Sequence, residues 1–194
     1  MTVDMPSESQ PAADDADSQV DPMAAYLADL ASRVGVPDES IAAAAAARSD
    51  SLTKPLGSLG RLETLGTWVS TVQGVCPPRA IERPRLVIFA GDHGVVAAAQ
   101  TSAYPSSVTA QMVMNFLNGG AAINVLARQH GVGLRVVDMA VDIDWEQAGV
   151  SLPEQVTRYK VRRSSRSLDR EDPLTRDEAF EAFCAGVAIA DEEV

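Results

Sequence analysis

The residues with the clearest chemical potential are Asp92 and His93, which stand between Gly91 and Gly94. An apolar run, residues 86–90, precedes them and is typical of a buried strand. Ligands of open parallel α/β sheets bind beyond the carboxyl ends of the strands, so this turn is predicted to open onto a polar site. Three interpretations stay open. The pair could begin a metal-dependent hydrolase site, serve as acid and base in a transfer reaction, or hydrogen-bond the backbone at the turn.

A second candidate group follows within residues 102–111. The ring of Tyr104 can stack on a flat ligand, and the amide of Gln111 can supply a directional hydrogen bond. Ser102 adds a hydroxyl, and Pro105 is typical of a helix start, whose free N–H groups suit polar ligands. These residue types suit a planar heterocycle, with ordinary helix capping as the simpler alternative.

The sequence offers little to bind a metal. The only other histidine is His130, and Cys76 and Cys184 lack the spacing of metal ligands. Two cysteines are also too few for a disulfide framework, which favours a reducing, cytoplasmic compartment. No apolar run is long enough to span a bilayer and no signal peptide is evident, so no membrane partner is expected.

The net charge of −11 is unevenly distributed. Residues 1–22 contain six acids and no lysine or arginine, which leaves −5 for the rest. An acidic chain argues against a nucleic-acid partner, because duplex binding depends on cationic side chains that neutralise phosphates. One basic cluster, within residues 158–170, could hold an anion, but we favour the solvated edge of a strand.

The expected organisation is a disordered acidic tail over 1–20, a helical segment over 21–80 and the first part of an α/β domain over 81–194. The helical segment is predicted to contain three helices. Asp21 caps the first, residues 41–48 form the second, and Ser58 caps the third.

In the α/β part, helical residues 102–117 and 121–130 lie between the strand at 86–90 and a second strand at 134–140, which predicts a parallel βαβ unit. Alternation over 156–161 predicts a third strand near an edge. A capping box, Thr175 with Glu178, then opens a helix. The predicted fold class is α/β, a parallel Rossmann-like sheet flanked by helices, with a small N-terminal helical part and an incomplete sheet.

Lys54 introduces a loop containing Pro55, Gly57 and Gly60. A lysine beside glycines is typical of a phosphate cradle, but the residue order is not that of a P-loop and no strand precedes it. We favour a structural loop that docks one helix on the next.

Three stretches together resemble one enzyme family. They are Lys54-Pro-Leu-Gly-Ser-Leu-Gly-Arg-Leu-Glu63, Gly91-Asp-His-Gly-Val95, and residues 102–127 with Ser-Ala-Tyr-Pro at their start and Asn-Gly-Gly-Ala-Ala-Ile-Asn within. In combination they resemble the nicotinate-nucleotide:dimethylbenzimidazole phosphoribosyltransferase family over residues 23–190.

The resemblance implies transfer of phosphoribosyl from nicotinate mononucleotide to 5,6-dimethylbenzimidazole, giving α-ribazole 5′-phosphate and nicotinate in cobalamin biosynthesis. It implies that Ser102, Tyr104 and Gln111 line the benzimidazole pocket, with Asp92 and His93 at its floor. It further implies a homodimer and no metal or redox cofactor.

In the family, the Gly-Asn-Thr-Thr phosphate loop and the general-base glutamate belong to positions after residue 194. We therefore assign no catalytic residue within this sequence and expect the chain to be inactive alone. The alternative is a non-catalytic module that binds benzimidazole or mediates dimerisation.

Overall fold

The computed structural model describes residues 21–194 and divides the chain into two compact units, Met1–Pro78 and Arg79–Val194. The predicted tail over residues 1–20 lies outside the described residues. Across residues 21–194, no helix combines the length and the apolar content needed to cross a bilayer.

The first unit contains three helices, α1 (Pro22–Arg33), α2 (Glu39–Ser51) and α3 (Arg61–Gln73). The carboxylate of Asp21 accepts a hydrogen bond from the Met23 N–H at 3.1 Å, which confirms the predicted cap of α1.

The predicted cap of α3 is wrong, because the residue at that position is Gly60 and no side chain caps the helix. Two successive turns, Pro55 to Ser58 and Gly57 to Gly60, take up the preceding residues. Gly60 then has a φ of +54°, which favours glycine, and α3 begins after it.

The second unit is built on two parallel strands, β1 (Arg85–Gly91) and β2 (Gly133–Ala140). The connection between them contains the short α4 (Val95–Ala99), α5 (Ser107–Leu117) and α6 (Ala122–Gln129). The register shifts at the end of the pair, where Ala90 lies opposite Asp138 but Gly91 lies opposite Ala140. This irregularity places a bulge at the carboxyl ends of the strands, a position where bulges often re-aim functional groups.

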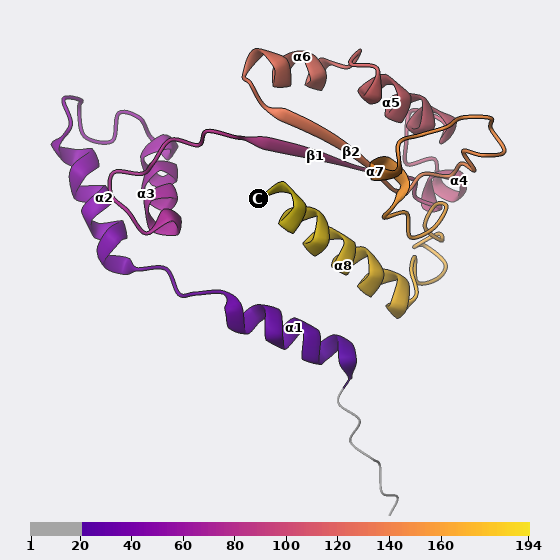
Figure 1. The fold of residues 1–194 in the computed structure, drawn as a ribbon, viewed down its shortest axis with the longest axis horizontal. Helices are drawn as coiled ribbons and strands as arrows, with labels where there is room; N and C mark the ends of the chain where they lie inside the picture. The colour runs from indigo at the N-terminus through magenta and orange to yellow at the C-terminus, as the bar shows by residue number, and fades with distance from the viewer. Residues whose placement is uncertain (1–20) are drawn as a thin grey trace, which may run out of the picture. The chain divides into compact units, whose positions relative to one another are not determined.

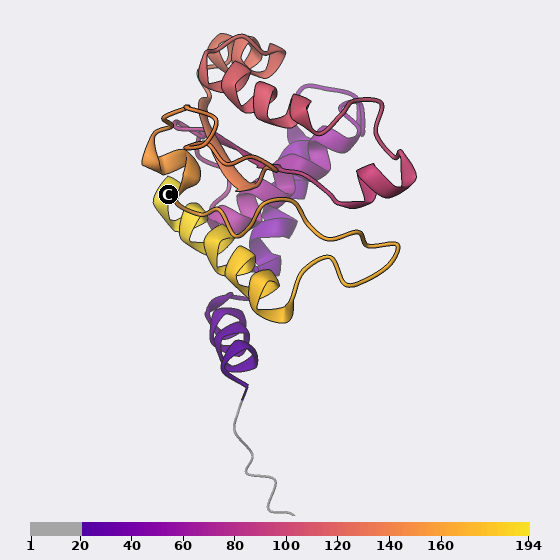
Figure 2. The same ribbon diagram turned by 90° about the vertical axis from the view of Figure 1, so that its right-hand side faces the viewer.

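Helices cover both faces of the strand pair: α5 and α6 lie on one face and α8 (Arg176–Glu193) on the other (Figures 1 and 2). On the α5 face, Ala90 and Val136 pack with the fully buried Val113. On the α8 face, Ile189 is buried and Arg135 reaches the acids at the end of the helix. The predicted class, a parallel α/β sheet flanked by helices, is confirmed.

The predicted third strand is wrong, because the described residues form a two-stranded sheet, and a short helix, α7 (Glu154–Thr157), covers the first two residues of the predicted segment. Pro153 stands at the N-cap of α7, and Val156 is buried against the core. Of the following residues, Val161 donates to the Met139 carbonyl at 3.0 Å, without a ladder that would define a strand.

The predicted helix over 102–117 begins later than expected, since α5 starts at Ser107. Pro105 accounts for this, because proline disfavours helical backbone in the residue before it. The short helix α4 was not predicted. The predicted capping box of α8 is confirmed: the Glu178 N–H donates to Thr175 Oγ1 at 3.1 Å, and the Thr175 N–H donates to Glu178 Oε2 at 2.7 Å.

Candidate functional site at the carboxyl ends of the strands

The turn after β1 is held in place by its backbone. The Asp92 N–H donates to the Ala140 carbonyl at 2.9 Å, which continues the strand pairing by one residue. On its other side the turn meets a distant segment, where the Ser165 N–H donates to the Asp92 carbonyl at 3.0 Å and the Gly94 N–H donates to the Ser165 carbonyl at 3.1 Å. The positions of Asp92 and His93 are therefore fixed by contacts with two other parts of the chain.

The carboxylate of Asp92 is buried, with 7% of the residue exposed, and both its oxygens accept hydrogen bonds. Thr109 Oγ1, on the first turns of α5, donates to Oδ1 at 2.6 Å, and the Asp142 N–H, after β2, donates to Oδ2 at 2.8 Å. Asp92 thus ties β1, α5 and the loop after β2 together. Of the three interpretations of the Asp92–His93 pair, these contacts support structural hydrogen bonding for Asp92.

His93 is exposed and lies between two cavities, lining both. The first has a volume of about 660 Å³ and the second about 270 Å³. An imidazole in this position can form a hydrogen bond with a molecule on either side.

The larger of these two cavities brings together four of the five predicted site residues, Asp92, His93, Ser102 and Tyr104. Tyr104 is 69% exposed, so its ring is available to a ligand. The predictions did not include several other residues of the lining. These are Gly91, Val95, Val96, Thr101, Pro105, Ser106, Val108, Thr109, Met112 and Leu168.

Gln111 does not line this cavity and is exposed on α5. The residues of α5 that face the cavity are Val108, Thr109 and Met112. Successive helical residues are about 100° apart around the axis, which turns Gln111 away from that face. The assignment of Gln111 to the ligand pocket stays a prediction.

The smaller cavity lies on the α8 side of the turn, between Phe89, Met139 and Ala182. Arg162 and Ser165 also line it. This cavity has apolar walls and one cationic side chain, Arg162, so it has room for part of a ligand that extends beyond His93 from the larger cavity.

The basic cluster within residues 158–170 was predicted to be the solvated edge of a strand, and this prediction is wrong. Arg162 Nη1 and Arg166 Nη2 both contact the carboxylate of Glu178, at 2.9 and 2.8 Å. The Thr175 N–H and these two guanidinium groups hold the pKa of Glu178 below its ordinary value of 4.5. Part of the cluster therefore fastens the segment before α8 to the N-terminus of that helix.

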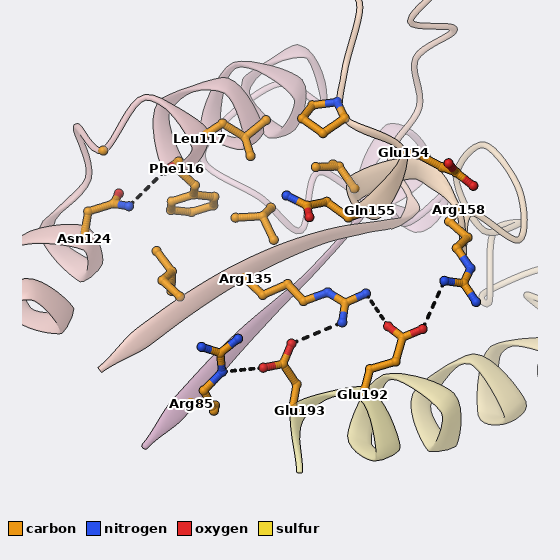
Figure 3. Close-up of a pocket in the computed structure, with 15 residues that line it drawn as sticks. Arg85, Phe116, Leu117, Asn124, Arg135, Glu154, Gln155, Arg158, Glu192 and Glu193 are labelled. Carbon is orange, nitrogen blue, oxygen red and sulfur yellow. Dashed lines mark hydrogen bonds and ion pairs between the residues drawn. The ribbon is translucent and has the colours of Figure 1, made fainter. Parts of the chain in front are cut away.

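A larger cavity, about 950 Å³, lies at the other end of the strands, around Arg85 and Arg135. Figure 3 shows these arginines converging on Glu192 and Glu193 at the end of α8. Arg135 contacts Glu192 at 2.8 Å and Glu193 at 3.1 Å, and Arg85 contacts Glu193 at 2.5 Å. These ion pairs neutralise the charges that a ligand would use, so size alone does not make this cavity the functional site.

The ion pairs shift the titration of the two acids. A hydrogen bond from the Tyr159 hydroxyl, with a second from Arg135, lowers the pKa of Glu192 below its ordinary value of 4.5. The pKa of Glu193 is lowered chiefly by the hydrogen bond from Arg85.

Lys54, in the first unit, forms an ion pair rather than a free phosphate cradle. Its Nζ lies 2.9 Å from Glu63 Oε1, and both side chains are mostly buried. The same oxygen accepts a hydrogen bond from the Leu59 N–H at 3.1 Å, which closes the loop. The Lys54 hydrogen bond lowers the pKa of Glu63 below its ordinary value of 4.5. These contacts support the structural role that we favoured.

Within residues 21–194, no three His, Cys, Asp or Glu side chains are grouped closely enough to hold a metal ion.

Comparison with known proteins places this geometry in a family. A family model described as phosphoribosyltransferase matches residues 34–194. The nicotinate-nucleotide–dimethylbenzimidazole phosphoribosyltransferase of Mycolicibacterium paratuberculosis is 54% identical over 161 residues, covering 83% of this chain and 44% of the relative. The enzyme of the same name from Mycobacterium tuberculosis is 55% identical over 161 residues, covering 83% of this chain and 43% of the relative.

A solved structure agrees. The crystal structure of the nicotinate-nucleotide–dimethylbenzimidazole phosphoribosyltransferase from Thermus thermophilus is 37% identical, with a TM-score of 0.70. The match covers 80% of this chain and 45% of the Thermus chain. This chain spans less than half the length of the relatives it matches. It belongs to the nicotinate-nucleotide–dimethylbenzimidazole phosphoribosyltransferase family.

Proposed function

We propose that this chain supplies the azole-binding part of an enzyme that transfers phosphoribosyl from nicotinate mononucleotide to 5,6-dimethylbenzimidazole. The names of its relatives support the reaction. The observation that carries the proposal is the cavity at the strand ends, where the exposed ring of Tyr104 stands near Ser102, Asp92 and His93. A volume of about 660 Å³ lies within the range of small-molecule sites.

The reaction makes one bond and breaks one at C1′ of the ribose. A benzimidazole nitrogen attacks C1′, the bond from C1′ to the nicotinate nitrogen breaks, and the second benzimidazole nitrogen loses its proton to a base. The pocket must therefore hold the flat ring with one nitrogen aimed at C1′. It must also present the other nitrogen to a proton acceptor.

In this chain, Tyr104 and the apolar wall beside it would hold the ring. Asp92 does not act as the base in this proposal, because both its oxygens already accept hydrogen bonds. His93 lies at the junction of the two cavities, where it would face the ring from one side and the ribose from the other. The phosphate loop and the glutamate base that the family resemblance implies would belong to the part of the relatives' length that this chain does not span.

The proposal is tested by titrating the chain with 5,6-dimethylbenzimidazole, using calorimetry for affinity and thermal shift for stability. Tyr104→Ala should weaken binding about 2- to 12-fold, because an aromatic pair contributes about 0.5–1.5 kcal/mol beyond its buried area. Leu126→Ala is the matched control, since Leu126 is 55% exposed on α6 and lines none of these cavities. Equal affinity of the Tyr104 and Leu126 variants would contradict the assignment of the pocket.

The same titration with Gln111→Ala decides whether Gln111 belongs to the pocket. Weaker binding would support the role that the family resemblance implies, and unchanged binding would agree with the position of Gln111 on α5. A parallel chromatographic assay with nicotinate mononucleotide tests for turnover. Binding without product would favour the non-catalytic module for this chain, whereas product would require a base within these residues, with His93 the first to test.

We further propose a homodimeric assembly and a cytoplasmic location. The thiols of Cys76 and Cys184 are both free, which suits a reducing compartment. Sedimentation equilibrium of the chain would test the dimer directly.

A further inference from the structure

Asp138, one of the most deeply buried polar residues described, lies on β2 and has no exposed surface. Its Oδ1 accepts a hydrogen bond from the Val141 N–H at 2.8 Å. Its Oδ2 accepts one from Trp145 Nε1 at 2.7 Å and another from Lys160 Nζ at 2.9 Å. Burying a carboxylate and an ammonium group costs desolvation free energy, which their mutual attraction often does no more than offset. This ion pair therefore calls for a role other than stability.

The ammonium of Lys160 makes two more contacts, both to the loop that follows β2. It donates to the Val141 carbonyl at 2.8 Å and to the Ile143 carbonyl at 2.9 Å. Lys160 therefore binds the backbone carbonyls on both sides of Asp142. Asp138 accepts a hydrogen bond from the Val141 N–H, and its carboxylate balances the positive charge of Lys160.

One peptide group connects this cluster to the strand-end cavity. The Val141 carbonyl and the Asp142 N–H belong to the same planar unit, in which they point in opposite directions. Lys160 binds the carbonyl at one end, and at the other end the N–H donates to Asp92 Oδ2 at 2.8 Å. Fixing the carbonyl fixes the direction of the N–H, and a cation at the carbonyl makes the N–H a stronger donor.

We propose that Lys160 and Asp138 are positioning residues for Asp92: they aim the peptide between Val141 and Asp142, whose N–H holds the Asp92 carboxylate at the wall of the cavity. Neither residue lines that cavity. The consequence for ligand binding rests on the proposed function, whereas the orientation of the peptide does not.

The first measurement needs no variant. In the isotopically labelled chain, NMR couplings across hydrogen bonds should connect the Asp142 amide nitrogen with the Asp92 carboxyl carbon. They should also connect the Lys160 ammonium with the carbonyl carbons of Val141 and Ile143. Detection of both supports the relay, and absence of either coupling in a well-resolved spectrum overturns it.

The second measurement removes the buried charges together, because Lys160→Met alone would leave Asp138 without its cation. In the Asp138→Asn/Lys160→Met variant, exchange of the Asp142 amide with solvent should accelerate about tenfold or more as its hydrogen bond weakens. Affinity for 5,6-dimethylbenzimidazole should fall as well. The control is Trp145→Phe, which removes another donor to Asp138 but leaves the peptide bound by Lys160 intact.

The control should lower the melting temperature without changing either the Asp142 exchange rate or the affinity, which a purely structural role of the cluster would not predict. If Asp142 exchange is unchanged in the double variant, the positioning role is wrong. Faster exchange with unchanged affinity overturns its relevance to the pocket. Faster exchange in a chain whose unmodified form does not bind the azole supports the peptide relay and contradicts the proposed function instead.

Discussion

Replacing Gly94 by alanine should destabilise the Arg79–Val194 unit, for a reason that is steric rather than conformational. Gly94 has φ −58° and ψ −26°, which alanine adopts readily. A Cβ there would lie 2.6 Å from the Ser165 carbonyl oxygen, 2.8 Å from the Arg166 carbonyl carbon and 2.9 Å from the Ser167 nitrogen. The first distance is about 0.8 Å short of the 3.4 Å at which ordinary contact begins. All three neighbours are backbone atoms, so no side chain can rotate away.

The size of the loss follows from two opposing terms. Overpacking of this kind costs about 1–3 kcal/mol. Alanine offsets about 0.4–1 kcal/mol of that by restricting the unfolded chain. We expect a net loss of about 1–2 kcal/mol in the free energy of unfolding, with displacement of the Ser165 segment from the turn.

Gly186→Ala is the matched control, because Gly186 lies inside α8 and an added Cβ would meet nothing within 4 Å. This variant should gain about 0.5–1 kcal/mol, since glycine in a helix interior is destabilising relative to alanine. Urea unfolding followed by tryptophan fluorescence measures both, with the buried Trp145 reporting on the unit and Trp68 replaced by phenylalanine. A Gly94→Ala variant as stable as the unmodified chain would refute the argument that backbone packs directly on the turn.

Two further predictions concern charge. Because the folded pKa values of Glu192 and Glu193 lie below 4.5, the unfolded state takes up their protons first, and the stability they provide is lost as pH falls from about 4.5 through the lower folded values. Urea midpoints of the unmodified chain should therefore drop over that range, and the drop should be smaller in a Glu192→Gln/Glu193→Gln variant; equal pH profiles would count against the α8 ion pairs. Lys54→Met should lower the melting temperature of the Met1–Pro78 unit because Glu63 loses its partner. Inorganic phosphate should not raise the melting temperature of this unit in the unmodified chain. A clear increase would instead support a phosphate-binding role for the Lys54 loop.

The main elements of the fold were predictable because their signals are local. The apolar runs at 86–90 and 134–140 became β1 and β2, and the intervening helical residues became α5 and α6. The start of α8 was predictable to the residue, because a capping box depends on Thr175 and Glu178 alone. A third strand was predicted over 156–161 because alternation cannot distinguish a strand from a short helix that buries one side chain, here Val156.

The candidate site was predictable only in part: residues close together in the sequence were found, and those contributed by a distant segment were not. Asp92, His93, Ser102 and Tyr104 lie within 13 residues of one another, beside a strand end that any parallel sheet would expose. Ser165 is 71 residues from Gly94, and its two shorter hydrogen bonds to the turn use backbone groups that every residue possesses; its hydroxyl adds only a contact of 3.4 Å with the Gly94 N–H. No side-chain pattern could have indicated it.

The partners of Asp92 illustrate why a sequence reveals polar residues more readily than their roles. An aspartate after a strand predicts a functional carboxylate, yet one oxygen is taken by Thr109 and the other by the Asp142 amide. A carboxylate with both oxygens engaged in hydrogen bonds anchors the groups that donate to it. Asp92 therefore holds α5 and the β2 loop together at the cavity. In the proposed function the exposed side chains of His93 and Tyr104 face the ligand, so a buried acid can define the shape of a site without reacting in it.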